Sequence, residues 1–317
     1  MAQDFQALLR RAKEIAPLLG EKPMSFGVPI TNRPAWEALG KHPAFQSLLR
    51  NAEALLQQPI PDLPDDLYLD FSRTGNRTRW QSVDSRRRAF LNPLVFAECL
   101  ENKGRFLPKL EELLRAFCAE RTWVMPAHDG DLANFKGQRI DIDLKASARG
   151  WELASVLYLL GDRLSPELRA LLEENLQRRI IQPFLLTLQG KHPRGLWWLA
   201  ATHNWNAVCL AGVTGTALAL LPSREERALF VAAAEHYIRN FLSGFTPDGY
   251  CSEGLGYWNY GFGNFVNLAE ILLQATQGRI DLLAWPEAQA PARFGARIGI
   301  LGGVYPAFAD CSVNARP

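Results

Sequence analysis

The sequence predicts an all-α protein, and three observations support this class. Apolar residues recur at intervals of three and four through most of the 317 residues. Strand-like runs are few and short, and proline or glycine separates the periodic segments. Hydrophobic residues make up 48% of the chain, which is ample for a large core. Because no repeat of fixed period is present, we expect stacked helical hairpins rather than a regular solenoid.

Seven segments carry the clearest helical signals, and several have recognisable ends. We expect helices over residues 5–19, 110–118, 144–160, 165–181, 206–221, 223–241 and 262–277. Gly161 stops the third segment, and Ser165 precedes Pro166 at the first helical position of the fourth. Ser223 and Glu226 form the pattern of a capping box at the start of the sixth.

Two regions depart from this helical pattern. Residues 59–88 are rich in proline, aspartate and arginine, which predicts an extended arm on the helical body. Residues 298–317 are apolar and contain glycine, but they lack a helical period. We therefore divide the chain into N-terminal helices and arm (1–90), a helical body (91–297), and the start of a linker to a further domain (298–317). On this interpretation the chain is an N-terminal fragment.

Composition excludes several classes of partner. The formal net charge is +2, so no global field attracts nucleic acid or an anionic membrane, and a polyanion would need a local basic patch. No apolar run is long enough to span a bilayer, and the N-terminus lacks a signal-peptide pattern. We expect a soluble, cytoplasmic protein, or a periplasmic one if a signal peptide has been removed.

The five cysteines are odd in number, and none lies in a spacing typical of a zinc site. Free thiols in a reducing compartment are the expected state. The residues present require no metal and no organic cofactor.

Two polar and aromatic clusters interrupt otherwise apolar sequence. The first is His203-Asn204-Trp205-Asn206, and the second runs from Glu253 to Gly261. Both contain groups that bind a sugar ring or move a proton, where a plain helical core needs neither. Trp197 and Trp198 lie just before the first cluster; being adjacent they point in different directions, so one is expected in the core and the other beside a cleft.

With three further stretches, the two clusters form a set of motifs. The set is Tyr68–Arg77, Trp123–Asp129, Trp197–Trp198, His203–Asn206 and Glu253–Gly261. It resembles, in order and from about residue 60 onward, the bacterial heparinase II/III-like family of polysaccharide lyases. The resemblance implies an incomplete (α/α) toroid followed by β-sandwich domains, which would lie beyond this chain. It also implies an acidic polysaccharide substrate, such as a heparin-like glycosaminoglycan or alginate, cleaved by β-elimination.

Such a lyase needs a donor that neutralises the uronate carboxylate and a group that transfers protons. The resemblance implies an asparagine or histidine for the first role and a tyrosine slightly over fifty positions later for the second. His203 and Asn204 precede Tyr257 by 54 and 53 positions, and both remain candidates for the neutraliser. Asn206 precedes Tyr260 by 54 positions, which leaves a second register open.

The remaining site predictions concern substrate binding. The residues assigned to it are Asn206, Trp205, Trp258, Tyr260, Glu253, Trp198, Arg73, Arg77 and His128. The family also uses a histidine from the following β domain, and no residue of this chain matches it. We therefore expect the chain alone to bind substrate and to turn it over weakly.

Each candidate also has a structural interpretation. Asn204 is a natural helix cap, Glu253 can bond backbone amides of the turn that follows it, and His128 beside Asp129 can fix a loop. Two other function classes remain open. A glycoside hydrolase would need paired carboxylates drawn from Asp129, Asp248 and Glu253. A non-catalytic carbohydrate-binding module would need only the aromatic and polar surface.

Overall fold

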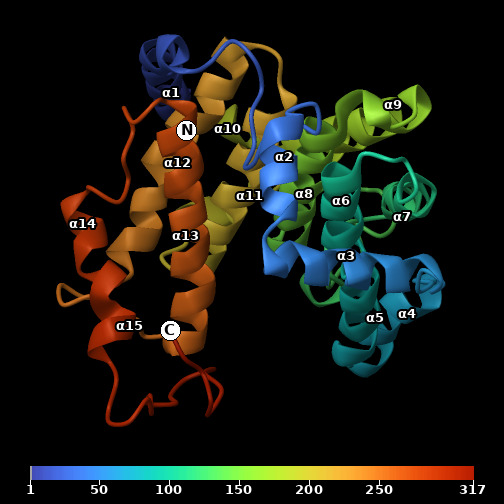
Figure 1. The fold of residues 1–317 in the computed structure, drawn as a ribbon. Helices are drawn as coiled ribbons and strands as arrows, with labels where there is room; N and C mark the ends of the chain where they lie inside the picture. The colour runs from blue at the N-terminus through green and yellow to red at the C-terminus, as the bar shows by residue number, and fades with distance from the viewer. Residues whose placement is uncertain (1) are drawn as a thin grey trace. The chain divides into compact units, whose positions relative to one another are not determined.

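The computed structural model describes residues 2–317, and it confirms the all-α class (Figure 1). The described part of the chain contains no β-strand, only an isolated antiparallel bridge between Leu301 and Val304. The α-helices are α1 (Ala2–Ile15), α2 (Arg33–Gly40), α3 (Pro43–Leu56), α4 (Asp65–Thr74), α5 (Thr78–Arg88), α6 (Leu91–Glu101), α7 (Leu107–Ala119), α8 (Leu144–Leu160), α9 (Pro166–Leu176), α10 (Gln182–Leu188), α11 (Asn204–Leu220), α12 (Arg224–Ser243), α13 (Leu255–Ala275), α14 (Pro286–Gln289) and α15 (Phe294–Arg297).

These helices form two compact units that alternate along the chain. Unit 1 comprises the chain up to Met24 together with residues 142–151 and 180–317. Unit 2 comprises residues 25–141 and 152–179. Helix α8 contributes residues to both units. The compact units therefore divide the chain differently from the segments 1–90, 91–297 and 298–317 that the sequence suggested.

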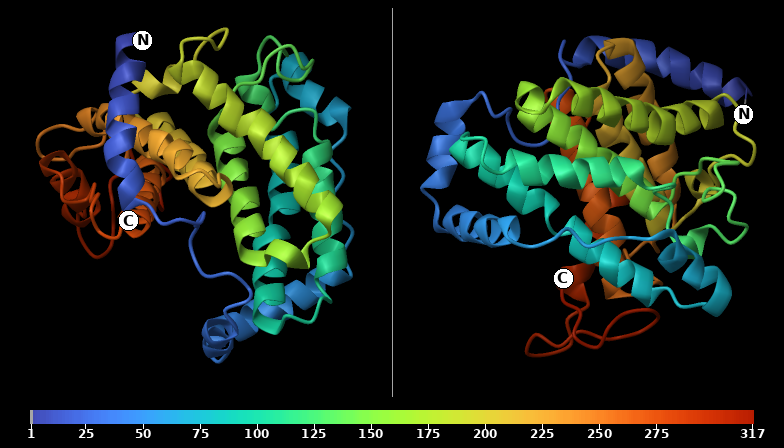
Figure 2. Two further views of the ribbon diagram at one scale, coloured as in Figure 1. Left: turned by 90° about the horizontal axis from the view of Figure 1, so that it is seen from above. Right: turned by 90° about the vertical axis from the view of Figure 1, so that its right-hand side faces the viewer.

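Helix α11 is the centre of unit 1. It is buried along almost its whole length and packs against both α12 and α13, while α1 packs on α12 (Figures 1 and 2). Small residues allow this close packing. A Cβ atom at Gly215 would lie 2.2 Å from the indole ring of Trp151 on α8, so only glycine fits there. The helix that begins with the first predicted cluster is thus held rigidly by its neighbours.

The helix ends agree with the sequence in some places and differ in others. The Ser223 hydroxyl accepts a hydrogen bond from the Glu226 amide at 3.1 Å, which confirms the cap of α12. Ser165 makes no such cap, because its hydroxyl lies 3.1 Å from the Glu111 carboxylate instead. Helix α13 begins at Leu255, seven residues before the predicted start at 262. The second cluster therefore lies mostly on a helix.

In unit 2, α6 packs against α2, α3 and α7, and α7 packs against α9. The predicted extended arm is wrong, because residues 59–88 contain the helices α4 and α5. The charges that suggested an arm stabilise helix ends. Asp65 and Asp66 lie in the first turn of α4, Arg73 lies in its last turn, and Gly75 closes it with a φ of 73°.

Helix α5 has few apolar residues, yet it has a buried face. Trp80, Asp84 and Arg87 are its buried residues, at spacings of four and three. That spacing places all three on one side of the helix. Two of them are charged, so hydrophobic periodicity alone does not detect this face.

The last twenty residues of unit 1 fold back on the start of α13. Phe308, Cys311 and Ala315 pack on a small cluster formed by Cys251, Leu255 and Phe294. The same segment exposes several apolar side chains, namely Ile300, Leu301, Val304 and Val313. The expectation that a linker begins here stays a prediction.

Candidate functional site

The first cluster forms the start of α11. Helix α11 begins at Asn204, and His203 precedes it in an extended conformation without capping it through its side chain. Glu253 supplies the missing acceptors from the segment before α13. Its Oε1 accepts a hydrogen bond from Asn204 Nδ2 at 2.8 Å, and its Oε2 accepts one from the Asn204 backbone N at 3.3 Å. A carboxylate here also stabilises the positive end of the helix dipole.

The second cluster forms the start of α13. Gly254 stands at the N-cap with φ 89° and ψ 172°, a conformation that side chains other than glycine rarely adopt. Leu255 follows and is fully buried, which anchors the first turn. Tyr257 is the third residue of α13 and is half-buried. The Glu253–Gly256 segment thus leads into α13, and the Glu253 carboxylate contacts the start of α11.

The two helix starts meet at Gly261. A Cβ atom at Gly261 would lie 3.0 Å from Cβ of Asn204, so the backbones of α11 and α13 approach closely at this point. Tyr257 lies four residues before Gly261 and therefore on the same face of α13, one turn away. Tyr260 is adjacent to Gly261 in sequence, lies on a different side of the helix, and is 39% exposed. The backbones of α11 and α13 are therefore close at Asn204, and Tyr257 stands one turn from that point on α13. The roles of the two side chains stay a prediction.

Aromatic rings surround His203. Trp197 is 58% exposed, and its ring centroid lies 4.8 Å from that of Trp205 and 5.9 Å from that of His203. Trp198 is 1% exposed, and its Nε1 donates to the carbonyl of Ile142 at 2.7 Å. The substrate-binding role predicted for Trp198 is therefore corrected: Trp198 is a core residue, and Trp197 occupies the accessible position.

Two more of the predicted binding residues have structural roles. Asn206 is fully buried, and its Nδ2 donates to the carbonyls of Trp198 and Leu199. The Trp258 ring stacks on Phe262 with centroids 5.6 Å apart, and its Nε1 donates to the Pro291 carbonyl. Asn206 fixes the loop before α11, and Trp258 packs beneath the C-terminal segment. Neither side chain offers its polar group to a ligand.

Arg73, Arg77 and His128 belong to unit 2. Arg73 is exposed and pairs with Asp66 at 3.3 Å, and Arg77 is exposed at the N-cap of α5. His128 ends a 3₁₀ turn, and the neighbouring Asp129 carboxylate is buried. Asp129 accepts hydrogen bonds from the backbone amides of residues 134 and 135, which fixes the loop.

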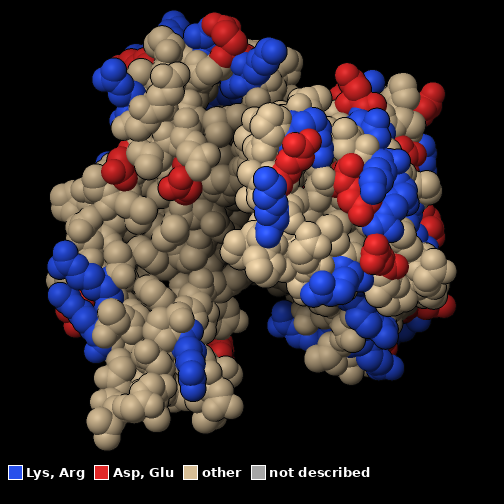
Figure 3. All heavy atoms as spheres, in the orientation of Figure 1, with Lys and Arg blue, Asp and Glu red and all other residues tan. Residues whose placement is uncertain are grey.

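The electrostatics around the cluster are sparse in cations. Among the described residues, no hydrogen bond or ion pair joins a lysine or arginine to His203, Asn204 or Tyr257. Helix α13 carries one charged residue, Glu270, and the side of it visible in Figure 3 is largely free of charged side chains. Burial raises the pKa of the Cys251 thiol, two residues before Glu253, which keeps it protonated.

The arrangement contains no obvious metal or membrane element. Within residues 2–317, no group of three or more His, Cys, Asp or Glu side chains is placed to hold a metal ion. No helix of this part of the chain has both the length and the apolar character needed to cross a bilayer. All five cysteines are free thiols.

No protein-family model matches the chain, and no curated protein matches it significantly. Any function of the candidate site must therefore be inferred from the chemistry of its residues. The sequence predicted a binding role for Trp198 rather than Trp197, because adjacency alone does not tell which ring is buried.

Proposed function

We propose that the chain is the helical part of a polysaccharide lyase that cleaves a uronate-containing polymer by β-elimination. One observation carries the proposal. Asn204 lies at the close approach of α11 and α13, and Tyr257 stands one turn from that approach on α13. The half-buried His203 directly precedes Asn204. An amide or imidazole donor and a tyrosine hydroxyl are the two groups that uronate elimination needs.

The chemistry assigns a role to each group. The proton at C5 of a uronate is weakly acidic because the adjacent carboxylate already carries charge. Asn204 or His203 donates a hydrogen bond to that carboxylate and stabilises the enolate that develops. Tyr257 transfers the proton between the sugar and the leaving glycosidic oxygen. Trp197, exposed beside Trp205, offers an apolar ring to a sugar face.

The two candidate neutralisers differ in what the fold leaves available. Asn204 is 3% exposed, and its Nδ2 already donates to Glu253, so one N–H of the amide remains for a substrate. His203 is half-buried, and its side chain does not cap the helix. These facts support His203 as the group that meets the carboxylate and Asn204 as the group that fixes the helix start.

The wider architecture is part of the proposal. We infer that the hairpins belong to an incomplete (α/α) toroid and that a β-sandwich domain of the same protein supplies a further histidine. A uronate polymer would be the partner, and nucleic acid and membranes would not. The test uses the natural protein in full length with heparin, heparan sulfate and alginate. Elimination forms an unsaturated uronide that absorbs in the near ultraviolet, and a chain that cleaves none of these polymers would refute the lyase assignment.

A sugar-binding module without catalysis is the second candidate, and the exposed ring of Trp197 favours it. It predicts that the full-length protein binds uronate polymers without shortening them. A hydrolase has less support, because the carboxylates available to it are engaged. Glu253 binds Asn204, Asp248 accepts from Thr246, and Asp129 is buried in a loop of unit 2. New reducing ends without ultraviolet absorbance would identify a hydrolase.

A further inference from the structure

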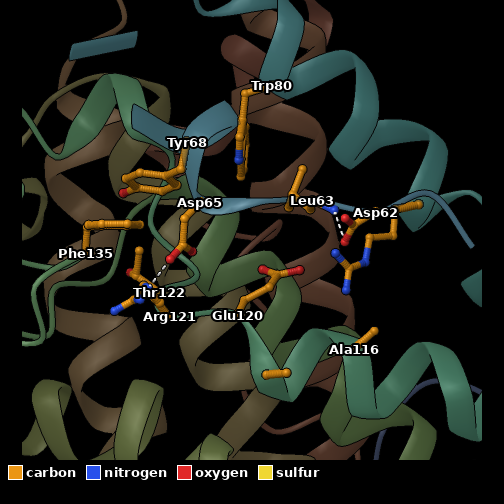
Figure 4. A pocket seen from close by; sticks show the side chains of 12 residues that line it. Asp62, Leu63, Asp65, Tyr68, Trp80, Ala116, Glu120, Arg121, Thr122 and Phe135 are labelled. Atoms are coloured by element: carbon orange, nitrogen blue, oxygen red, sulfur yellow. Dashed lines mark hydrogen bonds and ion pairs between the residues drawn. The ribbon is translucent and has the colours of Figure 1, made fainter. Parts of the chain in front are cut away.

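A pocket of about 300 Å³ lies within unit 2, and none of the residues assigned above to catalysis or substrate binding lines it (Figure 4). Its walls come from α4, α5, the end of α7 and the segment that follows α7. Figure 4 shows Trp80 pointing into this space from one side and Glu120 from the opposite side. The volume is at the small end of the range for small-molecule sites, about the size of one sugar ring.

Arg87 is the informative residue of this pocket. Its side chain lines the pocket although the residue is only 6% exposed. Its Nε is fully buried without a hydrogen-bond acceptor, and no ion pair of the described residues involves its guanidinium. Its Cζ lies over the ring of Phe117, 5.7 Å from the ring centroid. A buried guanidinium that forms no ion pair is costly even with the buried Asp84 three residues before it on α5, and a ligand would supply a closer anion.

The acidic residues of the pocket do not neutralise Arg87. Asp65 pairs with Arg121 at 2.5 Å, and Arg121 also lies over the ring of Phe135. Asp62 is exposed at the rim, where its carboxylate accepts from the Leu63 amide. Glu120 is half-buried, and none of its contacts involves Arg87. These carboxylates are hydrogen-bond acceptors, so they suit hydroxyl groups on the same ligand.

Aromatic rings give the pocket a fixed apolar wall. Tyr68 stacks on Phe135 with ring centroids 4.9 Å apart, and it meets Trp80 edge-on at 6.0 Å. The Tyr68 hydroxyl donates to the buried Asp129 carboxylate at 3.1 Å, so its ring cannot rotate freely. A wall held in place by packing and hydrogen bonds loses little entropy when a ligand binds.

We propose that this pocket binds a small hydroxylated carboxylic acid of about the size of one sugar ring. Arg87 holds the carboxylate, Asp62 and Glu120 accept hydrogen bonds from hydroxyl groups, and Trp80 contacts the apolar face. The proposal does not depend on lyase activity, because none of these residues belongs to the cluster in unit 1. Failure of one proposal therefore leaves the other intact.

The test measures binding of D-glucuronate to the whole chain by calorimetry and by quenching of tryptophan fluorescence. D-glucose has the same ring and hydroxyl groups without the carboxylate, and we expect it to bind at least about tenfold more weakly. Arg87→Gln should weaken glucuronate about tenfold to a hundredfold, whereas Arg86→Gln, on the exposed side of α5, should leave it unchanged. The Trp80→Phe variant should lose the fluorescence response, because Trp80 lines the pocket.

Two further variants keep the test decisive if Arg87→Gln does not fold. Arg87→Lys retains the charge but loses the planar guanidinium that can donate two parallel hydrogen bonds to a carboxylate. This variant should bind glucuronate more weakly than the parent. Ala119→Tyr places a ring at the exposed rim of the pocket and should abolish binding while the circular dichroism spectrum stays unchanged. Comparing a uronate disaccharide with free glucuronate shows whether the pocket prefers the end of a polymer or the free acid. Binding of the disaccharide or of glucuronate supports a carboxylate site.

Three results would overturn the inference. Equal affinity for glucose and glucuronate would remove the role of the carboxylate. Inorganic phosphate binding as tightly as glucuronate would show a general anion site without a place for the ring. Undiminished glucuronate binding by the folded Ala119→Tyr variant would place the ligand elsewhere.

Discussion

The carboxylate of Glu253 accepts both hydrogen bonds that Asn204 offers at the first turn of α11, one from Nδ2 at 2.8 Å and one from the backbone N at 3.3 Å. This contact ties the segment before α13 to the start of α11. It fixes the spacing between the two clusters, because Tyr257 follows Glu253 by four residues and His203 directly precedes Asn204. Glu253 thus positions Asn204 and the start of α11 relative to the start of α13.

Replacement of Glu253 should therefore be costly. Glu253→Ala leaves two part-buried donors without an acceptor, and we expect a loss of about 1–3 kcal/mol in the free energy of unfolding. Glu253→Gln keeps one oxygen but loses the charge, so its loss should be smaller. Urea denaturation measures both. Glu226→Ala removes an exposed carboxylate from the first turn of α12 and should cost no more than about 0.5 kcal/mol; an equal loss in Glu226→Ala and Glu253→Ala would contradict the assignment.

Tyr257 and Tyr260 offer a matched pair for catalysis. Tyr257→Phe removes only the hydroxyl and should lower kcat on the cleaved polymer about 100-fold or more, with little change in binding. Tyr260→Phe should retain nearly full activity, because Tyr260 lies off the face that meets Asn204. Initial rates of ultraviolet absorbance in the full-length protein measure the difference. The reverse result would establish the register that pairs Asn206 with Tyr260.

The adjacent tryptophans should separate binding from stability. Trp197→Ala removes an exposed ring and should weaken polymer binding while the unfolding midpoint stays nearly constant. Trp198→Ala opens a cavity in the core and should cost about 3–5 kcal/mol of stability. Thermal melting and affinity electrophoresis on uronate polymers report the two effects. A stability loss of similar size in both variants would show that Trp197 is a packing residue.

Gly261 and Gly263 test the close approach of α11 and α13. Gly261→Ala places a methyl group about 3.0 Å from Asn204 Cβ, and we expect a loss of about 1–3 kcal/mol. At Gly263 a Cβ meets nothing within 4 Å, so Gly263→Ala should stabilise the helix by about 0.5–1 kcal/mol. Chemical denaturation of the two variants should give opposite signs. A gain at both positions would mean that the helices separate without cost.

Burial raises the pKa of the Cys99 thiol to about 12. The unfolded chain ionises at its ordinary thiol pKa of about 8.5, whereas the folded protein keeps the proton. This contribution is fully present below pH of about 8.5 and is lost as the pH rises toward 12, at up to about 1.4 kcal/mol per pH unit. Between pH 8.5 and 10 the parent should therefore lose about 2 kcal/mol more stability than Cys99→Ala. Cys311→Ala, at a half-buried position, is the control, and a parallel decline in parent and Cys99→Ala would contradict the prediction.

The sequence predicts helices well where their ends carry local signals. Ser223 and Glu226 define the start of α12, and the bounds of α8 match the predicted 144–160 because Gly161 follows its last residue. These signals depend on neighbouring residues only, so no tertiary information is needed.

Other elements depend on contacts that a sequence does not display. The entry of α13 contains several glycines and polar aromatics, and its helical state depends on the buried Leu255 and on the C-terminal segment that covers it. The helices of the supposed arm depend on burial of Trp80 against Tyr68. Likewise, nothing local reveals that Arg87 is buried or that the Glu253 carboxylate serves another helix.

The pairing of α1 with α12 has a consequence for the order of folding. Arg11 bonds to Glu235, and the buried Arg227 donates to the carbonyls of Gly20, Glu21 and Lys22. The partners are separated by more than 200 residues, so α1 is synthesised well before its partner α12. During that interval the apolar side of α1 is without its native partner. A nascent chain stalled before residue 224 should therefore present this helix to chaperones, and completion of α12 should end that exposure.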